Sequence, residues 1–362
     1  MPPITLFRYI AGRMLAALFG MFGALSAIVL LADLVENLRF AEKSSADFAF
    51  ALQLTMLRVP AIAQTLLPFI FLFAAIWMFR DLNRRSELVV MRSAGLSVWR
   101  LVGPAAFLAA VGGLLVIVAI DPLSARMMAF GEKMKNDIRG RTTSVVRVFG
   151  DGIWLRQRDA TETLLINAAS VDDAGTLQQV TIWRLSPDAA FEERIDAPVA
   201  QLSGRTIELK EARMKTAGGQ MTQRTPIYAV PTALTLSAPL ENAPAPETMS
   251  IWELPRYMML ARAVGLSTTR YNIRFHDLCS TPLKLTAMVL IAALFSLGPA
   301  RAGGAFQLLV AAVGAGFALY VLSELSTALG ESGAAPEALA AWTPALVATI
   351  FAVSFLTRLE EA

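Results

Sequence analysis

Residues 101–120 read LVGPAAFLAAVGGLLVIVAI and contain no charged side chain. At 1.5 Å per residue, a helix of this length spans about 30 Å, which is the thickness of the hydrocarbon core of a bilayer. Asp121 follows directly, and from there to residue 275 the sequence becomes more polar and rich in turn-forming residues. The stretch therefore predicts a transmembrane helix that leads straight into a soluble insertion.

Five more apolar runs lie on either side: Met14–Ala32, Val59–Phe79, Pro282–Leu297, Ala305 to about Leu322, and Leu339–Leu356. None of the six carries a charge near its centre, as spanning helices require. The chain of 362 residues is 55% hydrophobic, above the roughly 45–50% of soluble domains. We expect a polytopic α-helical membrane protein with six transmembrane helices, organised as helices in 1–120, the insertion in 121–275, and helices in 276–362.

A cleaved signal peptide is the alternative at the N-terminus, where Arg8 and Arg13 precede the first apolar run. That run is longer than the roughly 7–15 apolar residues of a signal peptide, and it continues into charged sequence without a clear cleavage site. We therefore expect an uncleaved first helix.

The insertion contains short β-rich runs separated by the turn sequences GDG, DDAG, SPD and AGG. The runs are VVRVF, GIWLR, TLLINA, VTIWRL, RTIELKEARMKT and PIYAVPTAL. In RTIELKEARMKT the apolar phase slips by one residue near Glu211, as a β-bulge would produce. Mixed phase also occurs at Val180, Ile182, Trp183 and Leu185. We expect an all-β domain that forms a sandwich or jelly roll rather than a flat sheet.

Arginines gather in segments that would face one side of the membrane. They are Arg8 and Arg13 before the first helix, Arg80, Arg84, Arg85, Arg92 and Arg100 after the second, Arg301 after the fourth, and Arg358 after the sixth. Because cytoplasmic loops carry an excess of Lys and Arg, both termini are expected in the cytoplasm and the insertion outside. The loop with Glu331 and Glu337 agrees, whereas Arg39, Lys43 and Arg58 are exceptions.

The composition excludes several classes of function. Cys279 is the only cysteine and His276 the only histidine, so an internal disulfide, a thiolate cluster and a His-rich metal site are impossible. We expect His276 at a membrane interface rather than in a catalytic site. No Gly-Lys pair occurs, hence no P-loop, and any ATP must be hydrolysed by another subunit. The 32 basic and 29 acidic residues form no basic block, which argues against a nucleic-acid partner.

Residues 86–95 predict a short amphipathic cytoplasmic helix. Ser86 can cap it, Glu87 adds a favourable charge in the first turn, and Gly95 can end it. Leu88, Met91 and Gly95 share one face, which suits a groove on a partner protein. The alternative is a connector that rests on lipid headgroups.

Small residues recur at four-residue spacing in the first and fifth predicted spans: Gly12, Ala16, Gly20 and Ala24, then Ala312 and Gly316. Such stripes allow close helix approach, either between subunits or within the chain. Near the outer surface, four basic residues could bind lipid phosphates, or could simply anchor the helices: Arg39, Lys43, Arg58 and Lys284.

Six stretches resemble the LptF/LptG family of lipopolysaccharide export permeases, and the resemblance covers essentially the whole chain. They are LFRYIAGR (6–13), RVPAIAQTLLPFI (58–70), RRSELVVMRSAGLSVW (84–99), DPLSARM (121–127), GIWLRQ (152–157) and PETMSIWELPRYM (246–258). SELVVMRSAGLS is the most specific, but both branches of the family carry a version of it. The RYI start, GIWLR, SIWELP and the short LEEA tail resemble the LptG branch more, and the LptF role is the alternative.

The resemblance implies a permease subunit, not an enzyme, of an ABC transporter that extracts lipopolysaccharide from the bacterial inner membrane. An LptF–LptG heterodimer would work with two copies of the ATPase LptB, which hydrolyse ATP with Mg²⁺, and with LptC, which leads to the periplasmic LptA bridge. This chain would bind no cofactor itself. The residue matching the family's coupling glutamate is Glu87, the first and fifth helices would form gates, and the periplasmic jelly roll would carry acyl chains.

Two other readings stay open. An ABC permease for another lipid or a lipoprotein usually has four spans with the large domain after the first, whereas here three spans precede it. An intramembrane hydrolase would need paired acids or a Ser-His arrangement, and Glu324 has no obvious partner in the sequence.

Overall fold

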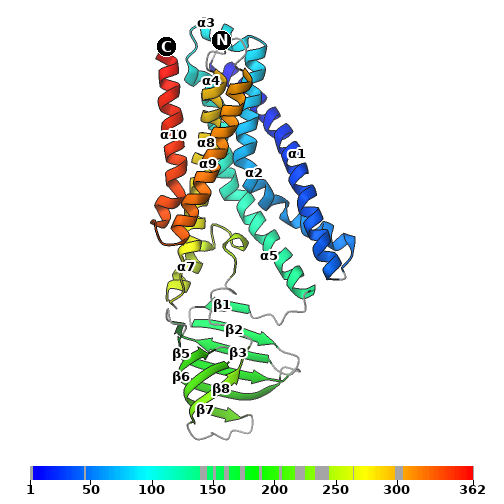
Figure 1. Cartoon of the computed structure of the whole chain (residues 1–362), viewed down its shortest axis with the longest axis vertical. Helices are drawn as coiled ribbons and strands as arrows, with labels where there is room; N and C mark the ends of the chain where they lie inside the picture. The colour runs from blue at the N-terminus through cyan, green and yellow to red at the C-terminus, as the bar shows by residue number, and fades with distance from the viewer. Residues whose placement is uncertain are drawn as a thin grey trace. The chain divides into compact units, whose positions relative to one another are not determined.

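A computed structural model describes residues 3–44, 46–138, 145–149, 152–158, 163–171, 176–186, 190–203, 206–216, 225–232, 244–263, 265–297 and 305–361. The chain divides into two compact units (Figure 1). The helical unit comprises Met1–Gly131 and Asn272–Ala362, and the β unit comprises Glu132–Tyr271. The expected turn GDG at 150–152 lies mostly outside the described residues, as do DDAG at 172–175, AGG at 217–219 and Arg301.

Six helices among the described residues are long and apolar enough to cross a membrane, which confirms the predicted number. The helical elements are α1 (Pro3–Lys43), α2 (Phe48–Arg84), α3 (Glu87–Ser93), α4 (Val98–Leu115), the π-helix η1 (Val116–Ile120), α5 (Asp121–Ile138), α8 (Thr269–Leu297), α9 (Ala305–Glu331) and α10 (Glu337–Glu361). The helices extend well beyond the apolar runs. In particular, the third span continues past Ile120 through η1 into α5.

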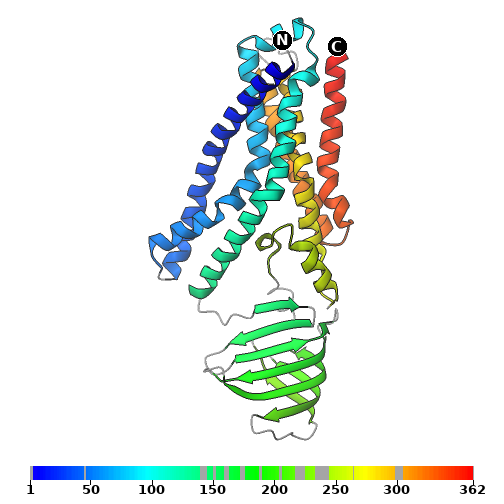
Figure 2. The same ribbon diagram turned by 180° about the vertical axis from the view of Figure 1, so that it is seen from behind.

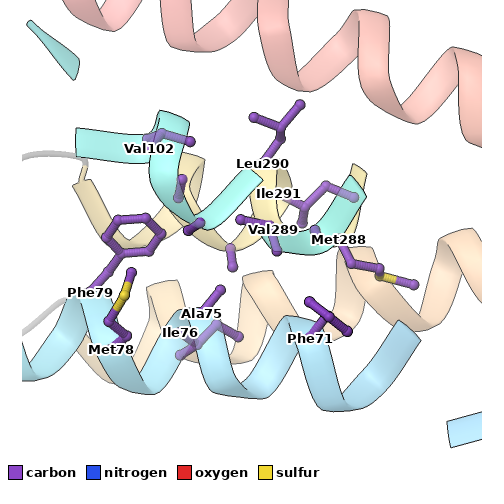
Figure 3. Packing of buried hydrophobic residues seen from close by; sticks show 14 of the residues in the cluster. Phe71, Ala75, Ile76, Met78, Phe79, Val102, Met288, Val289, Leu290 and Ile291 are labelled. Carbon is purple, nitrogen blue, oxygen red and sulfur yellow. The ribbon is translucent and has the colours of Figure 1, made fainter. Parts of the chain in front are cut away.

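The core of the helical unit is built from α2, α4 and α8, with further side chains from α1, α9 and α10. Phe71 and Phe79 of α2, Val102 of α4, and Met288 and Ile291 of α8 converge there (Figure 3). A Cβ on Gly113 would lie 2.3 Å from Pro282 Cα, so α4 and α8 touch backbone to backbone. Within its most apolar window, α8 is 56% buried, whereas α1 and α9 are 17% buried. α8 is therefore central, and α1 and α9 lie at the periphery.

One end of the helical unit carries α3 and both chain termini (Figure 1), and we call it the terminal end. The guanidinium of Arg92 donates to the Leu359 carbonyl at 3.2 Å, and the Val98 amide donates to Glu360 Oε2 at 2.7 Å. These bonds fasten α3 and the start of α4 to the end of α10. The opposite end, where α1 turns into α2, is called the distal end.

The β unit contains one antiparallel sheet in the order β1-β2-β3-β5-β6-β7-β8, with β4 paired to β5. Its strands are β1 (Val145–Phe149), β2 (Gly152–Arg158), β3 (Thr163–Ala168), β4 (Ser170–Val171), β5 (Thr176–Leu185), β6 (Phe191–Ser203), β7 (Thr206–Thr216) and β8 (Thr225–Pro231). The short elements η2 (Pro246–Thr248) and α7 (Leu254–Ala263) follow. The inserted antiparallel sheet is confirmed for the strands from Val145 to Pro231, which form a meander in one strongly curved sheet (Figure 2). The two ends of the expected range 121–275 are instead helical, in α5, α7 and the start of α8.

Each predicted β run forms a strand, but β6, the longest strand, has no counterpart among the predicted runs. Its sequence FEERIDAPVAQLS contains four charged residues and Pro198, both of which are uncommon in the middle of a sheet. Pairing with β5 on one side and β7 on the other overrides this weak local preference.

An irregular row crosses the middle of the sheet and explains the phase slip predicted near Glu211. Pro198 lies between Gln179 of β5 and Glu211 of β7, and these two residues have φ of 50° and 54°. Such left-handed backbone is rare outside glycine. Leu209 and Ala212 are both buried on the two sides of Glu211, so the slip is confirmed. The strand register is nevertheless the same on both sides of the row, both for β5 with β6 and for β6 with β7.

The mixed phase of β5 arises because both faces of the sheet carry large side chains. Val180 and Ile182 are buried in the core. Trp183 instead stacks on Trp154 with ring centroids 5.3 Å apart and an interplanar angle of 9°, and the Arg194 guanidinium lies 5.6 Å from the Trp183 ring centroid. Trp183 thus lies on the opposite face of the sheet from Val180 and Ile182. Aromatic stacking on that face explains why β5 carries apolar residues on both faces.

Candidate functional site

The helix α3 occupies the position predicted for the short amphipathic helix, with bounds Glu87–Ser93. Ser86 precedes it but makes no capping side-chain hydrogen bond, because its backbone is left-handed with φ 60°. The helix ends as expected at Gly95, which has φ 80° and whose amide donates to the Arg92 carbonyl. The cap is thus weaker than the sequence suggested, and contacts with the rest of the unit must position α3.

Two of the three residues on the α3 face that was expected to meet a partner, Leu88 and Met91, are directed into the chain's own core, whereas Gly95 is exposed. Leu88 is 4% exposed, and Met91 is partly buried against the same core. Val89 and Val90 are exposed instead, at 62% and 64%. The two valines therefore form the apolar surface of α3 that is open to another protein.

Glu87 belongs to a polar cluster at the terminal end that joins α1, α2 and α3. We call Tyr9, Arg13, Asp81 and Glu87 the terminal cluster. The Tyr9 hydroxyl donates to Glu87 Oε2 at 2.6 Å and accepts from Arg13 Nη2 at 2.8 Å. Arg13 Nη1 donates to Asp81 Oδ2 at 2.6 Å, and Arg13 Nη2 lies 3.8 Å from Glu87 Oε1. The side chains of Arg13, Asp81 and Glu87 are each about a third exposed.

Tyr9, Arg13 and Asp81 were not identified as site residues from the sequence. Each is a polar residue near the end of an apolar run, which is a common place for polar side chains. The available signal was that Tyr9 and Arg13 stand one turn apart on the same face of a helix, so both can reach one acidic neighbour. Only the fold shows that this neighbour is Glu87, 78 residues along the chain from Tyr9.

A second polar cluster holds α1 to α2 at the distal end. We call Asp33, Asn37, Thr55 and Arg58 the distal cluster. Arg58 Nη1 donates to Asp33 Oδ1 at 2.5 Å, and Asn37 Nδ2 donates to Asp33 Oδ2 at 2.8 Å and to Thr55 Oγ1 at 3.0 Å. Asp33, Asn37 and Thr55 are 8%, 2% and 1% exposed. Arg58, predicted as a phosphate-binding residue, is thus committed to a buried carboxylate of its own chain.

The other basic candidates divide into two kinds. Lys284 forms an ion pair with Asp277, about two turns earlier on α8. Arg39 and Lys43 lie near the end of α1 and are exposed. The structure therefore leaves Arg39 and Lys43 as the candidates best placed to meet a ligand from solution or from the membrane surface.

The two small-residue stripes differ in whether the chain itself covers them. On α1, Gly12, Ala16, Gly20 and Ala24 are exposed, and a Cβ on Gly12 or Gly20 would meet no atom within 4 Å. Ala16, Gly20 and Ala24 line a cavity of about 350 Å³, together with Trp77 and Met78 of α2. On α9, Ala312 is 1% exposed, and a Cβ on Gly316 would lie 2.3 Å from Leu72 Cδ2. These two α9 residues pack within the chain.

A buried ion pair links the third and fourth spans. Asp121 is 1% exposed at the junction of η1 and α5, and its Oδ1 lies 3.2 Å from Arg274 Nη2 of α8. Its burial suits a structural role, because a lone carboxylate there would be costly. Among the described residues no group of three His, Cys, Asp or Glu side chains could hold a metal ion.

Comparison with known proteins agrees with this architecture. The profile of the family described as lipopolysaccharide export system permease LptF/LptG matches residues 8–358. The chain is 24% identical to the lipopolysaccharide export system permease protein LptG of Haemophilus influenzae over 377 aligned residues, covering 99% of both chains. It is also 24% identical to LptG of Escherichia coli K12 over 312 aligned residues, covering 84% of both chains.

Proposed function

Because the chain belongs to the LptF/LptG family of lipopolysaccharide export permeases, we propose that it fills the LptG position of the transporter. It is a multi-pass inner-membrane permease subunit rather than an enzyme. The LptG assignment is supported by relatives of that name that align over nearly the full length. The partner permease in this proposal is LptF, and the reverse assignment of the two roles is the alternative.

The proposed orientation places the terminal end in the cytoplasm and the strands of the β unit, from Val145 to Pro231, in the periplasm. The arginines Arg80, Arg84, Arg85, Arg92 and Arg100 surround α3 at the terminal end, and both termini lie there (Figure 1). The loop between α9 and α10 carries Glu331 and Glu337 and no Lys or Arg. This asymmetry supports the orientation because cytoplasmic segments retain the basic residues.

An LptB ATPase dimer would bind at α3 and hydrolyse ATP with Mg²⁺, since this chain carries no nucleotide-binding motif. The observation that supports this site is the exposure of Val89 and Val90 on a helix fixed to its own unit. An apolar pair of this kind, rimmed by polar residues such as Glu87 and Arg92, suits a groove on the ATPase. ATP-driven closure of the dimer would then push on α3.

The open stripe on α1 is the proposed contact with a helix of LptF. Gly12, Ala16, Gly20 and Ala24 expose a thin helix face beside a cavity, which allows another helix to approach closely. Movement along this contact would open and close a lateral gate for lipopolysaccharide. Ala312 and Gly316 take part only indirectly, because they hold α9 against α2.

Lipopolysaccharide would leave through the β domain. The buried face of the sheet is lined by aliphatic residues such as Leu155, Ile166, Ile182 and Leu209, which suits acyl chains, and the route would continue through LptC to LptA. Arg39 and Lys43 are the residues proposed to meet lipid A phosphates.

Depletion of this protein in its host, followed by separation of the two membranes, tests the substrate. Lipopolysaccharide should accumulate in the inner membrane. If it still reached the outer membrane while another lipid or a lipoprotein accumulated, the substrate assignment would fall.

The docking site is tested by replacing both exposed valines of α3, Val89→Ser and Val90→Ser. Copurification of the ATPase with the permease pair should decrease, because the apolar surface is lost. Val89→Ile with Val90→Ile keeps that surface and is the matched control. Undiminished copurification of the serine variant would place the ATPase elsewhere.

A further inference from the structure

We infer that Tyr9 and Arg13 link α3 to α1, so that a displacement of the ATPase-binding helix moves the helix that carries the open small-residue stripe. This inference rests on the proposed function of α3 and names two positioning residues for transport. It assigns Glu87 a role toward its own chain in addition to any contact with the ATPase.

The position of α3 depends on its contacts with the rest of the unit. A helix of seven residues is too short to be stable by itself. Leu88 and Met91 anchor it to the core, and Arg92 ties it to the end of α10. Among the contacts described for α3, the side-chain bonds of Glu87 are the ones that reach α1.

A chain of hydrogen bonds runs from Arg13 through Tyr9 to Glu87. The Tyr9 hydroxyl is both donor to Glu87 and acceptor from Arg13, so it connects the carboxylate of α3 to the guanidinium of α1. The Arg13 guanidinium also lies 5.2 Å from the Tyr9 ring centroid, which fixes the ring one turn away from it. Arg13 also donates to Asp81, so the hydrogen-bonded chain extends to α2. A push on Glu87 is therefore shared between α1 and α2.

Arg13 lies at the end of α1 where the small-residue stripe begins. Arg13 lines the same cavity as Ala16, Gly20 and Ala24. The group that receives the link from α3 thus directly follows Gly12, the first residue of the stripe that a second subunit would cover. Because Arg13, Asp81 and Glu87 are each about a third exposed, the bonds can break and re-form without leaving a buried charge unpaired.

Tyr9→Phe tests the link because it keeps the ring and removes only the hydroxyl that joins Glu87 to Arg13. The complete transporter is reconstituted in liposomes with lipopolysaccharide, and both released lipopolysaccharide and hydrolysed ATP are measured. We expect the lipopolysaccharide released per ATP to fall about three- to tenfold, the loss typical of a partly exposed bond to a charged group. Copurification of the ATPase should be unchanged. Tyr320→Phe on α9, also beside a glutamate, Glu324 of the same helix, is the matched control.

A double variant separates the link from an independent role of Glu87. If Tyr9 acts through Glu87, Tyr9→Phe should lower the release per ATP no further in a Glu87→Ala background, which leaves the Tyr9 hydroxyl no acceptor on α3. A wild-type ratio for Tyr9→Phe, or two losses that multiply, would overturn the inference and leave the proposed function intact. Failure of the wild-type complex to release lipopolysaccharide would instead overturn the proposed function.

Discussion

The two polar clusters that join α1 to α2 use the same kind of ion pair in opposite surroundings. At the distal end, Arg58 meets Asp33, and the carboxylate is 8% exposed and also bonded to Asn37. At the terminal end, Arg13 meets Asp81, and both side chains are 31% exposed. In the distal pair the carboxylate is buried while the Arg58 side chain is 37% exposed, whereas in the terminal pair the carboxylate itself is open to its surroundings.

This difference has a mechanical consequence. A buried carboxylate that loses its partner keeps its desolvation penalty, so the distal cluster resists separation of α1 from α2. A pair open to water exchanges partners at little cost. We infer that α1 is fixed to α2 at its distal end and adjustable at its terminal end. Such an arrangement suits a helix that moves when α3 is pushed.

The largest effect is expected from Arg58→Ala at the distal end. The substitution leaves Asp33 buried without its cation, and we expect it to destabilise the protein by about 2–4 kcal/mol. Thermal unfolding of the detergent-solubilised protein measures this as a lower Tm. Arg39→Ala, which removes an exposed arginine near the end of the same helix pair, should leave Tm nearly unchanged. Equal Tm values for the two variants would contradict the role of the distal cluster in holding α1 to α2.

A smaller effect is expected from Asn37→Ala in the same cluster. The amide of Asn37 bridges Asp33 and Thr55, and its loss leaves two buried oxygens with one partner fewer. The expected destabilisation is about 1–3 kcal/mol, again read from Tm. Asn83→Ala, in the exposed last turn of α2, provides the comparison. If the two asparagine variants have the same Tm, the distal cluster is not closed to water as its burial indicates.

The sequence predicted the large features of this fold because they depend on local composition. Apolar runs such as residues 101–120 identified six spans, and short β-rich runs such as TLLINA, bounded by turn residues, identified strands. The longest strand, β6, was missed because Pro198 and its charged residues disfavour a strand locally, and two neighbouring strands supply what the local sequence lacks. The slip at Glu211 was visible because the apolar phase itself records it.

The candidate site was less predictable because its geometry depends on residues far apart in the chain. In α3 the residues Leu88, Val89, Val90 and Met91 are all apolar, so the sequence indicates an apolar helix without showing which side is buried. Of the predicted face, Leu88 is buried and Met91 partly buried, whereas Gly95 is exposed. Similarly, the sequence does not show that Arg58 pairs with Asp33 rather than with a phosphate, because the fold brings these two residues together from different helices. Asp277 and Lys284 lie about two turns apart on one helix, and their ion pair was not foreseen.

The smallest change in stability is expected at the terminal end, from Arg13→Gln. Both members of that pair are partly exposed, so their interaction contributes less than about 1 kcal/mol, and Tm should fall only slightly. Added salt screens exposed charges more than buried ones, so the difference from wild type should shrink at high ionic strength, whereas the loss caused by Arg58→Ala should persist. Tm values at low and high salt for both variants measure the contrast. Two results would contradict this contrast: a loss of Tm for Arg13→Gln as large as that for Arg58→Ala, or a loss that does not change with salt concentration. In either case the terminal end is as firmly closed as the distal end, and α1 has no adjustable end.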